Sequence, residues 1–173
     1  TFGPQFISDL RLKTKKIFDV HLMIHRVSKF LDDYIKAGSD IITFHYEIDE
    51  NINDIIDRIK QEKIKAGIAI KPKTSWEKIK EYLHSVDQVI IMTVEPGFGG
   101  QSVLTDQIEK IKNISHYIKK NNLNVDIEID GGVNFETGKL CVEAGANILV
   151  AGSFLFKQSS LTIATNKLND FFN

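Results

Sequence analysis

The chain has 173 residues, of which 42% are hydrophobic and 26% charged, as is typical of one soluble globular domain over residues 1–173. Its 22 Lys and Arg residues nearly balance 23 Asp and Glu residues, so the net charge of -1 offers no basic field to nucleic acid or an anionic membrane. The single cysteine, Cys141, excludes an internal disulfide, and no secretory signal or membrane-spanning apolar run is present. We therefore expect a cytoplasmic protein without nucleic-acid or membrane partners.

Short apolar runs rich in β-branched residues alternate with longer amphipathic segments along the chain. In chain order they predict strand 17–24, helix 27–37, strand 41–47, helix 52–61, strand 65–70, helix 75–83, strand 88–94, helix 108–119, strand 126–130, helix 135–143, strand 147–151 and helix 161–172. Gly38 and Gly145 each stand where a helix would end in a left-handed C-cap. Residues 1–16 contain no recognisable element.

Strict alternation of strands and helices predicts a parallel sheet with right-handed crossovers. The pattern alone does not distinguish an open, doubly wound sheet from a closed barrel. The short spacing between strands suits a TIM (β/α)8 barrel, whose eight units usually take about 200 to 250 residues. We therefore predict an α/β fold in which six of the eight βα units of such a barrel are present.

Ionisable side chains share one face of three predicted strands, close to where each strand ends. They are Asp19 and His21 on the first strand, Thr43, His45 and Glu47 on the second, and Glu128 and Asp130 on the fifth. Burying ionised side chains that serve no function costs several kcal/mol per ion. These side chains therefore indicate a polar rim at the end of the sheet where α/β enzymes bind substrates. A lone strand histidine would more often be a core residue. Asp19 and Glu128 lie one layer deeper and are expected to make supporting hydrogen bonds, whereas His25, His84 and His116 are expected at the surface.

Three glycine-containing loops follow the fourth, fifth and sixth predicted strands, at residues 96–101, 130–132 and 152–153. Glycine lets backbone N–H groups approach an anion closely, and barrels often bind phosphate with the loops after their last strands. A tight turn is the alternative explanation for any one of these loops. Neither the dinucleotide fingerprint nor the P-loop is present, so no nucleotide cofactor is expected.

Several of these segments together resemble the ribulose-phosphate 3-epimerase family. The resemblance runs along the whole chain, and its most specific part is Met-Thr-Val-Glu-Pro-Gly-Phe-Gly-Gly-Gln-Ser, which begins at Met92. The other matching segments are residues 1–4, 19–23, 36–40, 43–47, 129–133 and 150–153. The resemblance implies a TIM barrel of the pentose phosphate pathway that inverts carbon 3 of ribulose 5-phosphate to form xylulose 5-phosphate.

The resemblance also implies a divalent metal, either Zn, Fe, Mn or Co, and two-base proton transfer through a metal-stabilised enediolate. His21 would be a metal ligand that also touches the substrate, and Asp130 would be a ligand, a substrate contact and one of the two acid/base groups. The side chains of Met23 and Met92 would line the substrate-binding site. The remaining substrate contacts, mainly to phosphate, would be Gly97, Phe98, Gly99, Gly100, Gly131, Gly132, Gly152 and Ser153.

The sequence departs from the family pattern before residue 1. The family carries two preceding βα units, which supply a substrate-contacting Ser, the other metal-binding His, and the Asp that is both a ligand and the second acid/base. We therefore expect this chain alone to be inactive, with an open sheet whose exposed edges favour a homo-oligomer. The alternatives are a non-catalytic sugar phosphate-binding paralogue or an epimerase for a six-carbon substrate such as allulose 6-phosphate. Orotidine 5′-phosphate decarboxylase shares the phosphate loops, but the pairing of His21 with Asp130 favours a metal-dependent epimerase.

Overall fold

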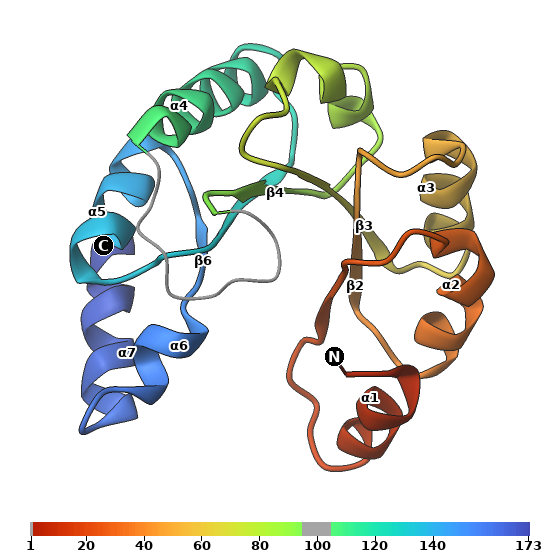
Figure 1. Cartoon of the computed structure of the whole chain (residues 1–173), viewed down its shortest axis with the longest axis horizontal. Coiled ribbons are helices and arrows are strands. Elements are labelled where there is room, and N and C mark those ends of the chain that lie inside the picture. Colours follow the sequence, from red (N-terminus) through yellow and green to blue (C-terminus); the bar gives the residue numbers. More distant parts are fainter. Residues whose placement is uncertain (1, 95–104) are drawn as a thin grey trace.

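Six parallel strands form one sheet in chain order in the computed structural model, which describes residues 2–94 and 105–173. The strands are β1 (Asp19–Leu22), β2 (Ile41–His45), β3 (Lys65–Ile70), β4 (Gln88–Met92), β5 (Asp126–Asp130) and β6 (Ile148–Val150). Within the described residues, β1 pairs only with β2 and β6 only with β5, so the strand row curls without closing (Figure 1).

One helix precedes β1, helices or 3-10 turns follow every strand, and most of these elements lie on the convex side of the curved sheet (Figure 1). They are α1 (Pro4–Arg11), α2 (Val27–Lys36), α3 (Ile52–Gln61), α4 (Thr105–Lys120), α5 (Phe135–Ala144), α6 (Gly152–Phe156) and α7 (Leu161–Asn169), with 3-10 turns η1 (Trp76–Ile79), η2 (Tyr82–His84) and η3 (Asp170–Phe172). This arrangement confirms the predicted TIM-type α/β architecture with six βα units. No helix in the described ranges combines the length and apolar character needed to cross a membrane.

The main core lies between the sheet and the helices. Helix α3 shows why these segments fold as they do, because Ile52, Ile55, Ile56 and Ile59 recur at helical spacing and are all buried. Residues of the opposite parity to the polar rim fill the strand side of this core, and Phe44 is fully buried there. Each fully buried side chain of this size contributes about 1.5 to 3 kcal/mol.

The predicted helix 161–172 is an α-helix only to Asn169, where α7 passes into the 3-10 turn η3. Two other segments differ in kind from the sequence predictions. The predicted helix 75–83 is not an α-helix but the pair of 3-10 turns η1 and η2, whose buried Ile79 and Leu83 are spaced as they would be on a helix. Helix α1 was not predicted, although its apolar residues Phe6, Ile7 and Leu10 recur at helical spacing; it is short, and Ile7 is its one buried residue. Pro4 at its first turn is a helix-start signal, since the missing N–H would have no partner there.

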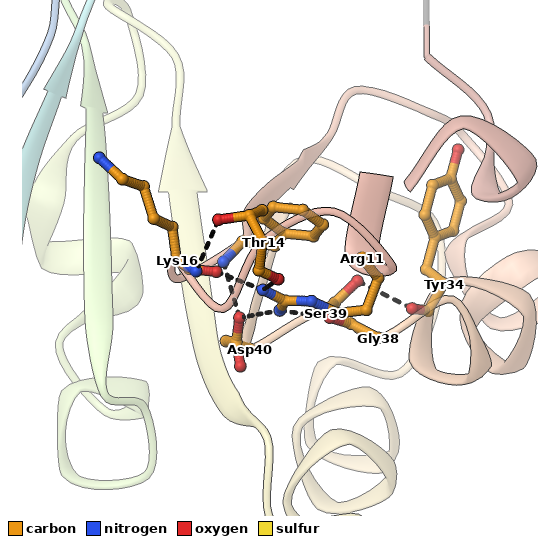
Figure 2. A network of polar contacts seen from close by, with 8 residues as sticks. Arg11, Thr14, Lys16, Tyr34, Gly38, Ser39 and Asp40 are labelled. Carbon is orange, nitrogen blue, oxygen red and sulfur yellow. Dashed lines mark hydrogen bonds and ion pairs between the residues drawn. The ribbon is translucent and has the colours of Figure 1, made fainter. Parts of the chain in front are cut away.

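Arg11 anchors α1 to the end of the sheet where β1 and β2 begin (Figure 2). Its guanidinium donates to Asp40 Oδ2 at 2.6 Å and to the carbonyl oxygen of Gly38 at 3.1 Å. Asp40 Oδ2 also accepts from the backbone N–H of Phe18 at 2.7 Å. Gly38 has φ +95° and Gly145 has φ +116°, so both glycines take the left-handed conformation predicted at these helix ends.

Candidate active site at the C-terminal ends of the strands

His21, His45 and Asp130 meet on the concave face of the sheet, where β1, β2 and β5 end. Nδ1 of His21 lies 3.5 Å from Oδ2 of Asp130, and the two side chains are only 14% and 24% exposed. On its other side, Nε2 of His21 lies 3.0 Å from Nε2 of His45, and the two rings are stacked. The structure therefore brings together His21 and Asp130, the two residues selected from the sequence as metal ligands.

Glu47 extends this row of polar groups beyond β2. Its Oε2 lies 3.2 Å from Nδ1 of His45, while its Oε1 accepts from the backbone N–H of Lys71 at 2.9 Å and from the Thr74 hydroxyl. Burial raises the pKa of the Glu47 carboxyl, but the hydrogen bonds from His45, Thr74 and Lys71 outweigh this and lower the pKa to about 2. Glu47 is therefore a fixed carboxylate at neutral pH.

A second polar layer lies deeper on the same face, around the buried amide of Gln88. Its Nε2 donates to Asp19 Oδ2 at 2.8 Å and to Glu128 Oε2 at 2.9 Å, with a longer contact of 3.4 Å to Thr43. Burial, followed by the nearby charge of Asp19, raises the pKa of Glu128 to about 9, so this carboxyl carries a proton at neutral pH. Asp19 and Glu128 thus make the supporting hydrogen bonds that were predicted for them.

The loops after β5 and β6 lie side by side, because Asp130 is paired with Val150 across the two strands. Gly131 has φ +120°, and a Cβ there would lie 2.5 Å from Cγ2 of Val94, so only glycine fits. Gly132 also has a positive φ, of +61°. Gly152 and Ser153 open α6 and are exposed, and a Cβ on Gly152 would meet nothing within 4 Å.

The other predicted site residues occupy different positions. Met92 is 2% exposed and packs with Ala69 and Ile90 on the concave face, whereas Met23 is 46% exposed just beyond β1. Met23 borders a cleft of about 200 Å³ that His45, Glu47 and Lys71 also line. The predicted contacts Gly97, Phe98, Gly99 and Gly100 lie outside the described residues. His25, His84 and His116 are exposed, as predicted.

Sequence reasoning missed Gln88 and Thr93. Gln88 begins an otherwise apolar strand with the parity of Ile90 and Met92, and that pattern was the available signal. Thr93 follows the same strand, and its hydroxyl donates to the carbonyl oxygen of Gly131 at 2.5 Å. No local pattern marks this contact, which links the end of β4 to the loop after β5.

The donor atoms present fit two positions of a metal site. Among residues 2–94 and 105–173, no group of three or more His, Cys, Asp or Glu side chains is arranged to hold an ion. His21 Nδ1 and Asp130 Oδ2 nevertheless stand 3.5 Å apart, a separation that suits two ligands bound to one ion at about 2.0 to 2.2 Å each. An imidazole with a carboxylate is also a donor pair that Zn, Fe, Mn and Co accept.

Comparison with known proteins decides the family. A sequence model of the ribulose-phosphate 3 epimerase family matches residues 1–156. The chain belongs to this family. Ribulose-phosphate 3-epimerase of Chlamydia muridarum is 39% identical over 165 residues, which cover 94% of this chain and 72% of the relative. The ribulose-phosphate 3-epimerase of Bacillus subtilis is 38% identical over 169 residues, covering 97% of this chain and 78% of the relative.

Solved structures of more distant enzymes share the fold of this epimerase family member. 3-Keto-L-gulonate-6-phosphate decarboxylase from Vibrio cholerae superposes with a TM-score of 0.68 at 16% identity, over 98% of this chain and 80% of that one. 3-Hexulose-6-phosphate synthase from Salmonella typhimurium gives a TM-score of 0.66 at 16% identity, over 97% and 79%. At this identity the likeness shows the TIM-barrel fold alone.

Proposed function

We propose that this chain forms the main part of a ribulose-phosphate 3-epimerase, which inverts carbon 3 to interconvert D-ribulose 5-phosphate and D-xylulose 5-phosphate. The observation that carries the proposal is the His21 and Asp130 pair, 3.5 Å apart at the C-terminal ends of β1 and β5 in a member of the epimerase family. This is the end of a TIM-type sheet where catalytic residues stand.

His21 and Asp130 would hold a divalent cation through Nδ1 and Oδ2. When bound, such an ion would supply Lewis-acid stabilisation of the negative charge that removal of the carbon 3 proton creates. His45 and Glu47 would not be ligands, because their polar atoms already face one another and other protein groups.

Asp130 would also be one of the two groups that transfer the carbon 3 proton. A carboxylate has two oxygens, so one can remain with the ion while the other accepts the proton. Its strand position points it into the concave face, and the N–H of Thr93 holds its backbone carbonyl at 3.0 Å. Precise positioning of this kind is what general base catalysis requires.

Inversion needs a second acid/base on the opposite side of the substrate. Glu47 does not suit this step, because hydrogen bonds from His45, Lys71 and Thr74 already occupy its carboxylate. An apolar groove of about 480 Å³ borders β1, lined among others by Phe2, Phe6 and Val20, and within residues 2–94 and 105–173 no strand pairs with β1 on the side away from β2. We expect the second group on a segment that covers this groove and continues the sheet.

The loops after the last two strands would bind the substrate phosphate. Gly131 and Gly132 bring their backbone close to this region, and Gly152 leaves open space beside the first turn of α6. Because the chain has a net charge of only -1, attraction of the phosphate would depend on such local N–H groups, together with Gly97 to Gly100.

Exchange of the carbon 3 proton with solvent deuterium tests this proposal in the complete protein that contains this sequence. Asp130→Asn is expected to abolish exchange on ribulose 5-phosphate. The matched control Asp126→Asn lies at the other end of β5, where Asp126 binds Asn147 and Lys65, and should retain exchange. Unchanged exchange in Asp130→Asn would contradict the assigned role. Sugar phosphate binding without exchange in the wild type would favour the non-catalytic paralogue, and faster exchange on allulose 6-phosphate would favour the six-carbon substrate.

A further inference from the structure

Glu47, His45, His21 and Asp130 form one continuous row across the concave face. We infer that Glu47 and His45 are positioning residues that set which nitrogen of His21 carries the proton and leave its Nδ1 free to face Asp130. This inference rests on the proposed function for its metal-binding part, while its account of the histidine protons stands on the hydrogen-bond geometry.

The row starts from a carboxylate that can only accept hydrogen bonds. Both oxygens of Glu47 are engaged, Oε1 by the Lys71 N–H and the Thr74 hydroxyl and Oε2 by His45, so the carboxylate has a fixed orientation. Its Oε2 lies 3.2 Å from Nδ1 of His45. Because an ionised carboxylate has no proton to give, Nδ1 of His45 must be the donor in this contact.

The proton on Nδ1 determines the role of the other nitrogen of His45. In a neutral imidazole only one nitrogen carries hydrogen, so Nε2 of His45 is an acceptor. It lies 3.0 Å from Nε2 of His21, which must then be the donor. The rings are stacked with their centroids 4.9 Å apart and their planes 21° apart, which restricts rotation of either ring.

The proton on Nε2 of His21 leaves its Nδ1 with a lone pair, 3.5 Å from Oδ2 of Asp130. Two acceptors at this distance, on side chains that are 14% and 24% exposed, repel unless a cation lies between them. The row therefore creates a cation-binding pair at the place where the proposed function needs one. Such an outer partner commonly orients a ligating histidine, and its loss typically lowers metal affinity 10- to 100-fold.

Side-chain nitrogen NMR of the complete protein that contains this sequence, in its metal-free form, tests the inference directly, because protonated and bare imidazole nitrogens have distinct shifts. The wild type is expected to show His21 protonated on Nε2 and His45 protonated on Nδ1. His45→Phe retains an aromatic ring for stacking but removes the acceptor, so His21 should then populate both tautomers. Zn²⁺ affinity, measured by competition with a chelating dye, should fall 10- to 100-fold in the same variant.

Glu47→Gln provides a second test at the edge of the site, in case His45→Phe folds poorly. It removes the charge that orients His45 and should shift the His21 tautomer in the same direction by a smaller amount. The matched control is His84→Phe, because His84 is an exposed histidine bonded to the Tyr117 hydroxyl at 3.2 Å and lies outside the row. This control should leave the His21 tautomer and the Zn²⁺ affinity unchanged.

The possible outcomes separate the inference from the proposed function. A metal-free wild type with His21 protonated on Nδ1 would overturn the inference, as would a His45→Phe variant with the wild-type tautomer and Zn²⁺ affinity. If the wild type binds no Zn²⁺ but His45→Phe still changes the His21 tautomer, the positioning role stands and the proposed metal site fails.

Discussion

The amide nitrogen of Gln88 donates to Oε2 of Glu128 at 2.9 Å, and the same NH2 group reaches Asp19 Oδ2 at 2.8 Å. One side chain on β4 thereby joins β1 and β5 across the concave face. Asp19 and Glu128 each stand two residues before His21 and Asp130 on the same strands. The Gln88 amide therefore supports the layer directly beneath the proposed metal ligands.

Gln88→Met is expected to destabilise the protein by about 2 kcal/mol, because the buried Glu128 carboxyl would lose its donor, whereas the exposed Asp19 carboxyl can be hydrated instead. Urea unfolding measures this loss. Gln107→Met is the matched control, since Gln107 is also buried at 2% exposure but, within residues 2–94 and 105–173, its side chain donates to a single acceptor, the Pro72 carbonyl at 3.2 Å. Its loss should be near 1 kcal/mol. Equal losses in the two variants would argue against a special role for the Gln88 bridge.

Gly131→Ala is expected to cost about 1 to 3 kcal/mol and to weaken sugar phosphate binding, because φ at this position is +120° and a Cβ would clash with Val94. Gly152→Ala is its counterpart in the neighbouring loop, where a Cβ meets nothing within 4 Å. That variant should stay within about 0.5 kcal/mol of the wild type. Thermal unfolding and a phosphate titration compare the two, and a stable Gly131→Ala protein would show that the loop can relax.

Glu47 should make stability depend on pH in the acid range. Burial raises its pKa, but hydrogen bonds from His45, Thr74 and Lys71 lower it from 4.5 to about 2 in the folded protein. A carboxyl whose pKa is lower in the folded protein than in the unfolded chain stabilises the folded protein at pH values above the unfolded pKa. This contribution to the free energy of unfolding disappears as the pH falls from about 4.5 toward 2.

The free energy of unfolding of wild type minus that of Glu47→Gln should therefore be larger at pH 7 than at pH 2.5, by about 1 to 2 kcal/mol after allowance for solvent screening. Urea unfolding at a series of pH values provides the measurement. A difference that does not change between these pH values would mean that the hydrogen bonds to Glu47 do not favour its charged form.

Much of the architecture could be predicted from local patterns. The bounds of β3, β5 and α3 agree with the predicted ranges 65–70, 126–130 and 52–61, because each segment has a continuous apolar run or strong helical periodicity. Two local predictions failed for different reasons. In 75–83 the spacing of the buried residues Ile79 and Leu83 imitates a helix, whereas α1 is a short helix that was overlooked although Phe6, Ile7 and Leu10 recur at helical spacing.

The candidate site was predictable only in part. Period-two alternation placed His21 and Asp130 on one face of their strands, because a strand side chain can point to only one of two sides. The partners of those residues were not predictable. The contact of His21 with His45 depends on how β1 is aligned with β2. Gln88 donates to Asp19, which lies 69 positions away in the chain, and to Glu128, which lies 40 positions away.

The βα alternation, the parity of the polar rim and the likeness to the epimerase family can all be recognised in the amino-acid sequence, since they depend on neighbouring residues or short motifs. Three contacts become visible in the folded chain: His45 faces Nε2 of His21, Glu47 is held by Lys71 and Thr74, and Gln88 joins two carboxyl groups. These contacts depend on strand register and on distances of about 3 Å between segments remote in sequence, which periodicity does not encode.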